Sequence, residues 1–524
     1  MSDPFATTSD DADFDRAVAA LLARGPGRMV PDLARITALA ELLGDPQLAY
    51  PSVHVTGTNG KGSVVRMVGA LCSAAGLSAG TYTSPHLQTV RERLGLAGRH
   101  IARRRFAELH DELAGFADLL DARARETDGP AAAHVTFFEF LTAMAYAWFA
   151  DVPVDVGIFE VGMGGRWDAT NLVRGEVAVL NEIDVDHPEL GATPAEVAEE
   201  KVGIVKPGAH VVSARQAPEV QVVIDHAVVA SDATLWQVGR ELEVVDRRVA
   251  VGGQLLALRV GDRVVDEVLL PLYGAHQAAN AALALGAFAA LTGDAFAAMD
   301  DDVVRHGLGA VVVPGRLEIA RRDPTVVLDG AHNPHGAHAL AATLEESFGF
   351  REVVLVAACL DDKDVDGILT ELRDVASHVV VTGAPSPRAA SLDRMRDAAE
   401  RVWAGTGRIV EVAVDLPGAL DLAEAMVGPG DGVVVAGSLL TVGAARDRYL
   451  PVAADDEAFG PEDALVRPPD DDQEPLRHGD GLDDLETLDH LDDVALDALI
   501  AEHGRRFGDD EPTDAHPGDP ETDP

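Results

Sequence analysis

Short apolar runs alternate with stretches of helical periodicity along most of the chain. The apolar runs stand at residues 52–57, 77–82, 154–162, 176–183, 210–214, 325–330, 352–358, 378–383 and 431–437. The stretches that predict helices include residues 63–75, 103–125, 137–150, 194–204 and 274–291. Because strands that alternate with helices form mostly parallel sheets covered on both faces, the pattern predicts an α/β fold.

A break in this alternation near residues 312–314 predicts a domain boundary. A chain of 524 residues is also too long for one ordinary core. We therefore predict a first α/β domain at residues 15–312 and a smaller one at 315–450. Residues 240–270 hold short strands separated by glycine turns, and they predict an antiparallel insertion at one edge of the first sheet.

The composition changes near residue 452. From there to residue 524 the chain is dominated by Asp, Glu, Pro and Gly, a composition that cannot bury enough apolar surface to fold alone. We predict a mostly disordered acidic tail at 452–524. Within it, residues 485–500 have apolar positions at helical spacing, which indicates a transient helix or, alternatively, a docking helix for a partner.

Charge and hydropathy narrow the classes of partner. The formal net charge of −46 argues against a nucleic-acid-binding protein. The chain has no apolar run of 18 or more residues, and its N-terminus is acidic and polar, so neither a membrane span nor a signal peptide is expected. We expect a cytoplasmic protein, monomeric, with small-molecule partners.

A glycine-rich loop follows the apolar run at 52–57. The stretch VHVTGTNGKGSVVRMVGAL departs from the common phosphate-loop pattern at Val55, where a glycine is usual, and at Gly62, where a hydroxyl is usual. Its context of strand, glycine turn and helix still predicts a phosphate site, with a plain flexible turn as the alternative. Since no hydroxyl follows Lys61 directly, other residues must help to hold a magnesium ion.

Three residues near the ends of other strands are candidate magnesium ligands: Ser84, Glu160 and His187. Ligands of such sheets bind at the carboxyl ends of the strands, which is where these residues stand. His187 read alone also fits a structural histidine.

Lysine is rare in this chain, with arginine at nearly every other basic position. The four lysines are Lys61, Lys201, Lys206 and Lys363. A sequence that uses arginine so widely keeps lysine where a compact ammonium or an amine able to lose its proton is required. The bias therefore favours a chemical role for Lys61 and Lys201.

Several motifs appear in a fixed order over roughly residues 15–450. They are GTNGKGS, TYTSPHLQTVRERL, TFFEFLTAMAY, EVGMGGRWDATN, DVDHPELGATPAEVAEEKVGIVKPG, GAHQAANAALAL, PGRLE, LDGAHNP, DDKD and GSLLTVG. Together they resemble folylpolyglutamate synthase/dihydrofolate synthase, a branch of the Mur ligase superfamily. The resemblance implies a P-loop-type ATPase domain with a mostly parallel sheet, followed by a smaller Rossmann-like C-terminal domain.

The resemblance also implies the chemistry. ATP would phosphorylate a carboxylate, and the amine of L-glutamate would attack the acyl phosphate, which needs positioning and charge neutralisation more than covalent catalysis. The implied cofactors are ATP and two Mg²⁺ ions, one held by Ser84 and Glu160 and the second partly by His187. The implied ATP-binding residues are Thr58, Asn59, Gly60, Lys61, Gly62, Ser63, Asn280, Arg316 and Asp329.

Three residues are the implied catalytic set: Lys61, Lys201 and His332. By resemblance, Lys201 is carbamylated, which turns its cation into an anion able to face magnesium. The alternative is an ordinary helix-surface lysine in charge pairs. His332 is expected to order the loop after residue 330 near the glutamate or phosphate site.

The acceptor would be dihydropteroate or a reduced folate. By resemblance, its pterin end contacts Thr136, Phe137, Phe138, Glu139, Trp167, Asp168 and Ala169. Phe137 and Phe138 fit equally well as core residues at the start of a buried helix.

Two other functions remain as alternatives. A Mur-type peptide ligase acting on a nucleotide-sugar substrate would need a larger domain before the phosphate loop. A non-catalytic ATP-binding module would be expected to lose Lys61, Glu160 or His187, and all three are present.

Overall fold

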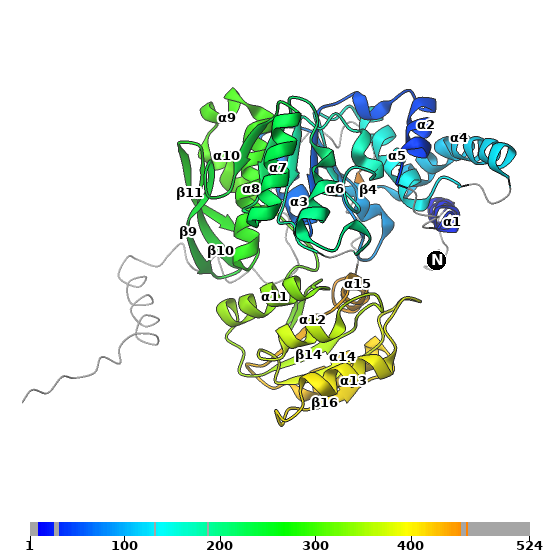
Figure 1. Cartoon of the computed structure of the whole chain (residues 1–524). Helices are drawn as coiled ribbons and strands as arrows, with labels where there is room; N and C mark the ends of the chain where they lie inside the picture. Colours follow the sequence, from blue (N-terminus) through cyan, green and yellow to red (C-terminus); the bar gives the residue numbers. More distant parts are fainter. Residues whose placement is uncertain (1–8, 26–30, 130–132, 186–187, 452–456, 459–524) are drawn as a thin grey trace, which may run out of the picture. The chain divides into compact units, whose positions relative to one another are not determined.

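The computed structural model describes residues 9–25, 31–129, 133–185, 188–451 and 457–458 (Figure 1). The chain divides into compact units at residues 1–466 and 467–524, and all described residues lie in the first. In the described part of the chain, no helix is both long enough and apolar enough to cross a membrane.

Sheet A is the larger sheet of the described residues and confirms the predicted parallel α/β fold. Its strand order is β18-β4-β3-β2-β5-β1-β6-β7-β8, and β1 pairs in parallel with both β5 and β6. The strands span Ser52–Thr56 (β1), Ala79–Tyr82 (β2), Leu94–Leu96 (β3), Arg99–Ile101 (β4), Val156–Glu160 (β5), Val177–Leu180 (β6), His210–Ser213 (β7), Thr234–Gln237 (β8) and Glu457–Ala458 (β18).

The helices of the first 312 residues either contact strands of this sheet or pack on neighbouring helices and strands (Figure 1). They span Ser9–Ala23 (α1), Ala34–Leu42 (α2), Lys61–Ala74 (α3), Arg103–Asp128 (α4), Phe137–Asp151 (α5), Pro194–Lys201 (α6), Pro218–Ala230 (α7), Ala275–Thr292 (α8), Asp294–Ala298 (α9) and Asp301–Gly309 (α10). Short 3-10 helices lie at Pro46–Leu48 (η1), Val90–Arg93 (η2), Ala169–Leu172 (η3), Pro188–Leu190 (η4) and Val202–Ile204 (η5).

Both faces of sheet A are buried, as the continuous apolar runs predict. In β6, Val177 and Val179 pack into the cluster formed with α3 and α8, whereas Ala178 and Leu180 pack with α6 and α7. Successive side chains of a strand point to opposite faces, so one run of apolar residues supplies two layers of core.

The predicted antiparallel insertion at 240–270 exists, but it does not extend an edge of sheet A. Strands β9 (Leu242–Ala250), β10 (Gly253–Val260) and β11 (Arg263–Leu270) form a separate sheet in the order β11-β10-β9. It packs on α8, where Gly286 leaves room for Leu242, since a Cβ at Gly286 would lie 2.7 Å from that side chain. The three strands meet sheet A only through an isolated bridge between Val238, directly after β8, and Leu242 at the start of β9, among the described residues.

Sheet C follows residue 315 and confirms the second predicted α/β region. Its order is β12-β13-β17-β14-β15-β16, with only the β12–β13 pair antiparallel among its described strands. The strands span Glu318–Arg322 (β12), Thr325–Leu328 (β13), Val353–Ala357 (β14), His378–Val381 (β15), Val410–Val412 (β16) and Gly432–Ala436 (β17).

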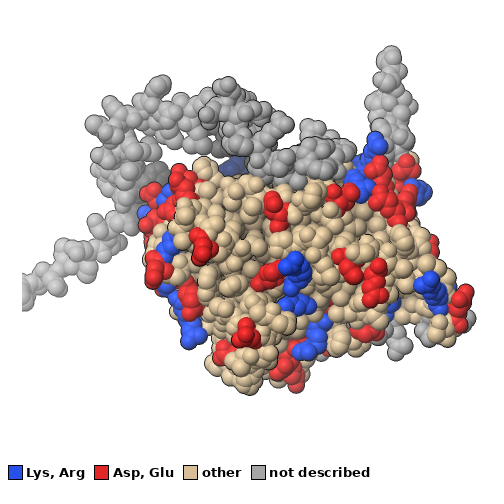
Figure 2. Space-filling view, turned by 90° about the horizontal axis from the view of Figure 1, so that it is seen from above, with Lys and Arg blue, Asp and Glu red and all other residues tan. Residues whose placement is uncertain are grey.

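The helices of this region cover both faces of sheet C. They span Pro334–Ser347 (α11), Val365–Leu372 (α12), Leu392–Val402 (α13), Leu416–Met426 (α14) and Leu439–Tyr449 (α15). On the face of the molecule shown in Figure 2, acidic and basic side chains are interspersed.

Strand β18 adds two residues to sheet A beside β4, with Glu457 opposite His100 and Ala458 opposite Ile101. The rest of the predicted tail, including residues 485–500, lies outside the described residues. Within the predicted tail, the two described residues thus belong to sheet A.

Candidate active site

The phosphate loop joins β1 to α3. Helix α3 begins at Lys61, two residues before the predicted start, so the lysine stands on the first turn. Its Nζ donates hydrogen bonds to the carbonyl oxygens of Gly57 (3.0 Å) and Thr58 (3.1 Å). The first N–H groups of a helix lack partners within the helix, and together with an ammonium group they form an anion site.

Two glycines allow polar side chains to approach the loop closely. Gly60 has φ of 78°, and a Cβ there would lie 2.5 Å from Nδ2 of Asn181. A Cβ at Gly62 would lie 3.3 Å from Oε2 of Glu160. The hydroxyl missing after Lys61 is thus replaced in space by the Glu160 carboxylate. Asn181 was not predicted, although its place directly after strand β6 is a signal that could have found it.

Glu160 lies at the carboxyl end of β5 and is buried. Its Oε2 accepts a hydrogen bond from the backbone N–H of Ser84 (2.9 Å). Burial raises the pKa of this carboxyl group, and the attraction of Lys61 and the hydrogen bond from Ser84 oppose the rise. A cation bound here would therefore stabilise the ionised form.

A magnesium ion fits the residues that the structure describes at this point. The Ser63 hydroxyl is buried, and no described residue hydrogen-bonds to it. A carboxylate and an unpartnered hydroxyl oxygen beside an anion site are the hard oxygen ligands that Mg²⁺ prefers. Within the described residues, no three His, Cys, Asp or Glu side chains group to hold a metal, and the predicted ligand His187 lies outside them.

A cavity of about 810 Å³ opens from the phosphate loop. Its lining includes Lys61, Asn280, Arg316, Asp329 and His332. It thus brings together predicted nucleotide residues that are far apart in the sequence.

Asn280 is buried on α8 and is held from two sides. Its Oδ1 accepts from Asn181 Nδ2 (2.8 Å), and its Nδ2 donates to Gln277 Oε1 (3.1 Å). This chain of amides ties α8 to the end of β6, next to the phosphate loop.

Asp329 ends β13 and is buried. Its Oδ2 accepts from the N–H of Leu317 (2.9 Å) and its Oδ1 from the N–H of Ala331 (2.8 Å). Burial raises the pKa of Asp329, while the charge of Arg316 opposes the rise. The carboxylate therefore links the segment that follows Arg316 to the loop after β13, in addition to lining the cavity.

The loop after β13 also contacts the phosphate loop. Asn59 pairs with His335 (Nδ2 to Nδ1, 3.1 Å) and accepts a hydrogen bond from Asn333 Nδ2 (3.1 Å). His332 Nδ1 lies 2.8 Å from the Gly330 carbonyl, so this nitrogen carries the proton that is donated. His335 was not predicted, because nothing in its local pattern marks a contact across 276 residues.

Lys201 ends α6 and is 4% exposed. Its Nζ donates to the carbonyl oxygen of Gly57 (3.0 Å), which also accepts from Lys61. Lys201 is therefore a buried neighbour of the phosphate loop and not a residue of the helix surface.

Thr136 and Glu139, two of the predicted acceptor contacts, form the N-terminal capping box of α5. Thr136 Oγ1 accepts from the Glu139 N–H (3.2 Å), and Glu139 Oε2 accepts from the Thr136 N–H (2.9 Å). Glu139 also pairs with Arg35 at 2.9 Å. Both side chains stabilise the start of the helix.

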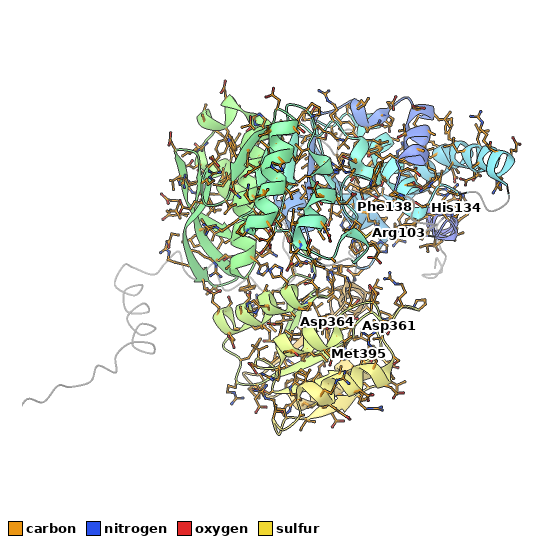
Figure 3. All side chains as sticks on the ribbon, viewed as in Figure 1. Arg103, His134, Phe138, Asp361, Asp364 and Met395 are labelled. Carbon is orange, nitrogen blue, oxygen red and sulfur yellow. The ribbon has the colours of Figure 1, made fainter. Side chains whose placement is uncertain are left out.

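Phe137 and Phe138 occupy the first turn of α5, and both are half-buried (Figure 3 labels Phe138). The Phe138 ring lies 6.0 Å from that of Tyr82, and the Arg93 guanidinium lies 5.2 Å from the centre of the Phe137 ring. Partial exposure leaves aromatic surface that a flat ligand can contact.

The remaining predicted acceptor contacts follow β5. Trp167 is 47% exposed, whereas Asp168 and Ala169 are buried. The Asp168 carboxylate accepts from the N–H groups of Thr170 and Met163, both at 3.0 Å. Asp168 thus shapes the loop that presents Trp167.

Comparisons with known proteins place this geometry among ligases. Residues 315–439 match the family model of the Mur ligase, glutamate ligase domain. The chain is 44% identical to the dihydrofolate synthase/folylpolyglutamate synthase of Mycobacterium tuberculosis over 443 residues, 80% of this chain and 91% of that protein. The enzyme of the same name from Bacillus subtilis is 32% identical over 423 residues, which cover 80% and 95% of the two chains. The solved structure of Mycobacterium tuberculosis folylpolyglutamate synthase complexed with ADP superposes with a TM-score of 0.78 and 43% identity, covering 84% of this chain and 99% of that one.

Proposed function

Because the chain belongs to the dihydrofolate synthase/folylpolyglutamate synthase family, we propose that it ligates L-glutamate to the carboxylate of a pteroyl substrate at the expense of ATP. The acceptor is dihydropteroate or a reduced folate. The observation that carries this proposal is the phosphate loop with Lys61, set against the buried carboxylate of Glu160 at the mouth of one cavity.

The nucleotide occupies the cavity beside the phosphate loop. Residues 58–63 hold its phosphates, and Asn280, Arg316 and Asp329 contact it from the other walls. In this arrangement residues 15–312 form the ATP-binding domain and residues 315–450 the domain that completes the site. The hydrogen bonds between Asn59 of the phosphate loop and Asn333 and His335 of the second region support this assignment, since they join the two regions beside the proposed phosphate site.

Magnesium would be held by Glu160 with the hydroxyl groups of Ser84 and Ser63, and His187 would contribute to a second ion. When bound, the ions neutralise phosphate charge and polarise the γ-phosphoryl group. Lys201, carbamylated, would supply an anionic oxygen ligand in place of a cation. Its burial against Gly57 supports this role. An unmodified ammonium group there would place a second positive charge next to Lys61, whereas a carbamate would not.

The reaction then has two balanced steps. A carboxylate oxygen of the acceptor attacks the γ-phosphorus of ATP, the bond to the β,γ-bridging oxygen breaks, and ADP leaves. The amine of L-glutamate attacks the acyl carbon, the bond to the phosphate oxygen breaks, and inorganic phosphate and a proton are released. Lys61 stabilises the charge on the phosphates in the first step, and His332 lies at the cavity wall where glutamate would enter.

The pteroyl group binds beside the first turn of α5. The half-exposed rings of Phe137 and Phe138 and the exposed Trp167 supply aromatic surface for a flat heterocycle. Thr136, Glu139, Asp168 and Ala169 act on the acceptor mainly by shaping these loops.

The test is a coupled assay of the purified chain with ATP, Mg²⁺, L-glutamate and either dihydropteroate or tetrahydrofolate. We expect ADP release that requires both the acceptor and glutamate, and a product heavier than the acceptor by one glutamyl residue. The proposal would be overturned if ADP were released at the same rate with and without the acceptor, or if neither acceptor gave a glutamylated product.

A further inference from the structure

Arg93 is a buried arginine that lies outside the nucleotide cavity. It ends the 3-10 helix η2 and is 9% exposed. Burying a guanidinium group is costly unless anions or hydrogen-bond acceptors replace the water that it loses. The contacts of the Arg93 guanidinium group therefore indicate whether its role is structural or in ligand binding.

Among the described residues, Arg93 has a single hydrogen-bond acceptor. Its Nε donates to Nδ1 of His86 (2.9 Å). An arginine N–H can only donate, so Nδ1 of His86 is the unprotonated, accepting nitrogen of that ring. The two terminal NH₂ groups have no acceptor and no salt bridge within the described part of the chain.

The surroundings of Arg93 combine aromatic surface with the edge of the phosphate site. We call Tyr82, Phe137 and Phe138 the aromatic cluster. The Arg93 guanidinium lies 5.2 Å from the centre of the Phe137 ring, and Glu160 is close enough to attract its charge. Arg93 thus adjoins both the aromatic cluster and the carboxylate that faces the phosphate loop.

Arg24 shows how the same fold satisfies a comparable arginine. Its guanidinium lies 4.8 Å from the centre of the Phe140 ring, which is also on α5. Unlike Arg93, it forms salt bridges with Asp118 (2.9 Å) and Asp121 (3.0 Å). Among the described residues, the arginine on Phe140 is paired by salt bridges, whereas the arginine on Phe137 has carboxylates near it but forms no salt bridge.

We propose that Arg93 binds the acceptor carboxylate that becomes glutamylated. This inference rests on the proposed function and specifies which group of the chain recognises the reacting end of the acceptor. A pteroyl substrate is an aromatic body that ends in a carboxylate. The half-buried rings of Phe137 and Phe138 pack against the body, and the two terminal NH₂ groups of Arg93 donate hydrogen bonds to both carboxylate oxygens.

This placement has a consequence for the order of recognition. A carboxylate gripped at Arg93 lies on the side of Glu160, next to the phosphate loop, and is held before it attacks the γ-phosphorus. Arg93 exchanges no proton in that step. An acceptor whose carboxylate is replaced by a neutral group loses this contact and leaves the guanidinium buried without an anion.

The experiment compares two ligands on three forms of the full chain. The ligands are dihydropteroate and its carboxamide analogue, which keeps the shape and removes the charge. The proteins are the wild type, Arg93→Gln and the matched control Arg24→Gln, each titrated calorimetrically in the presence of the non-hydrolysable ATP analogue AMPPCP. We expect the wild type to prefer the carboxylate by about 10- to 100-fold, the range of a charge-assisted pair.

In Arg93→Gln this preference should fall to within about 3-fold of unity, whereas Arg24→Gln should keep it. Arg93→Lys should keep part of it, because the charge remains and the fork is lost. Thermal melting separates folding from binding. Arg24→Gln should lower Tm, since it leaves two carboxylates unpaired, and Arg93→Gln should not, since it removes an unpaired buried charge.

Each other outcome overturns the assignment. An undiminished carboxylate preference in Arg93→Gln would show that Arg93 does not bind the carboxylate, while glutamylation by the wild type would keep the proposed function intact. Weaker AMPPCP binding with an unchanged carboxylate preference would assign the guanidinium to the nucleotide. Failure of the wild type to bind either ligand would overturn both proposals together.

Discussion

At the scale of single residues, Lys61 is the clearest test of the phosphate loop. Its side chain is half-buried, and its ammonium group donates to the loop carbonyl oxygens of Gly57 and Thr58. We expect Lys61→Ala to reduce kcat by at least about 10²-fold, the loss typical of one charge-stabilising group, with an unchanged far-UV spectrum. Phosphate release measures the rate. Turnover near that of the wild type would remove the loop from the mechanism.

Glu160 gives a residue-scale prediction on the metal. Glu160→Gln keeps the shape but removes the charge that faces the loop, so the Mg²⁺ concentration for half-maximal activity should rise at least about 10-fold. Because burial raises the pKa of this carboxyl group, its ionised form costs stability above that pKa, and the ligand-free variant should melt no lower than the wild type at neutral pH. An unchanged magnesium titration would contradict the assignment.

Lys201 tests the carbamate. The side chain is buried against Gly57, and only an amine can be carbamylated. Lys201→Arg should therefore lose activity as heavily as Lys201→Ala, and a small carboxylate such as acetate should restore part of the activity of the alanine variant. A surface ion pair would tolerate arginine at a cost under about 1 kcal/mol. Full activity in Lys201→Arg, or an intact mass without the added carboxylate under bicarbonate, would refute the modification.

The sequence was sufficient to predict site residues that lie at or after the carboxyl ends of strands, next to glycines, such as Lys61 and Glu160. It missed His335, because the contact of this residue with Asn59 joins segments distant in the chain, and it missed Asn181 although the place of that residue directly after β6 is a usable signal. It also could not find Arg93, whose distinguishing property is that no described carboxylate forms a salt bridge with it, and this is visible only when all neighbours are in place.

At the scale of elements, the capping box of α5 separates two explanations for the residues at its start. Thr136→Val removes the cap and should lower the free energy of unfolding by about 1 kcal/mol, while Thr136→Ser should keep it. Denaturant unfolding measures the difference. If Thr136 served mainly to contact the acceptor, Thr136→Val would instead raise KM for the acceptor with stability unchanged.

The same scale shows why the order of elements was predictable and one placement was not. The buried strands of sheet A are continuous apolar runs, and this character is local, so β1, β5 and β6 were predicted within three residues of their bounds. Whether β9–β11 extend sheet A or pack on α8 depends on a partner surface, including Gly286, that local periodicity does not encode.

At the scale of the whole molecule, the acidic tail can be separated from the catalytic unit. Strand β18 pairs with β4 at the edge of sheet A, with β4, β3, β2 and β5 between it and the strand that carries the phosphate loop. A chain ending at Ala458 should keep the specific activity and Tm of the full chain, because the composition of the segment after it is that of a solvated chain.

A chain ending at Val452 also loses β18, so its Tm is expected to lie slightly below that of the chain ending at Ala458. Each backbone hydrogen bond contributes about 0.5–1.5 kcal/mol, so loss of a two-residue strand should lower Tm slightly and leave activity unchanged. Comparing both truncations with the full chain by thermal melting and the glutamate-dependent assay isolates the two contributions. A large loss of Tm or activity already in the chain ending at Ala458 would mean that the segment at 485–500 docks on the folded unit, because no described pairing is removed by that cut.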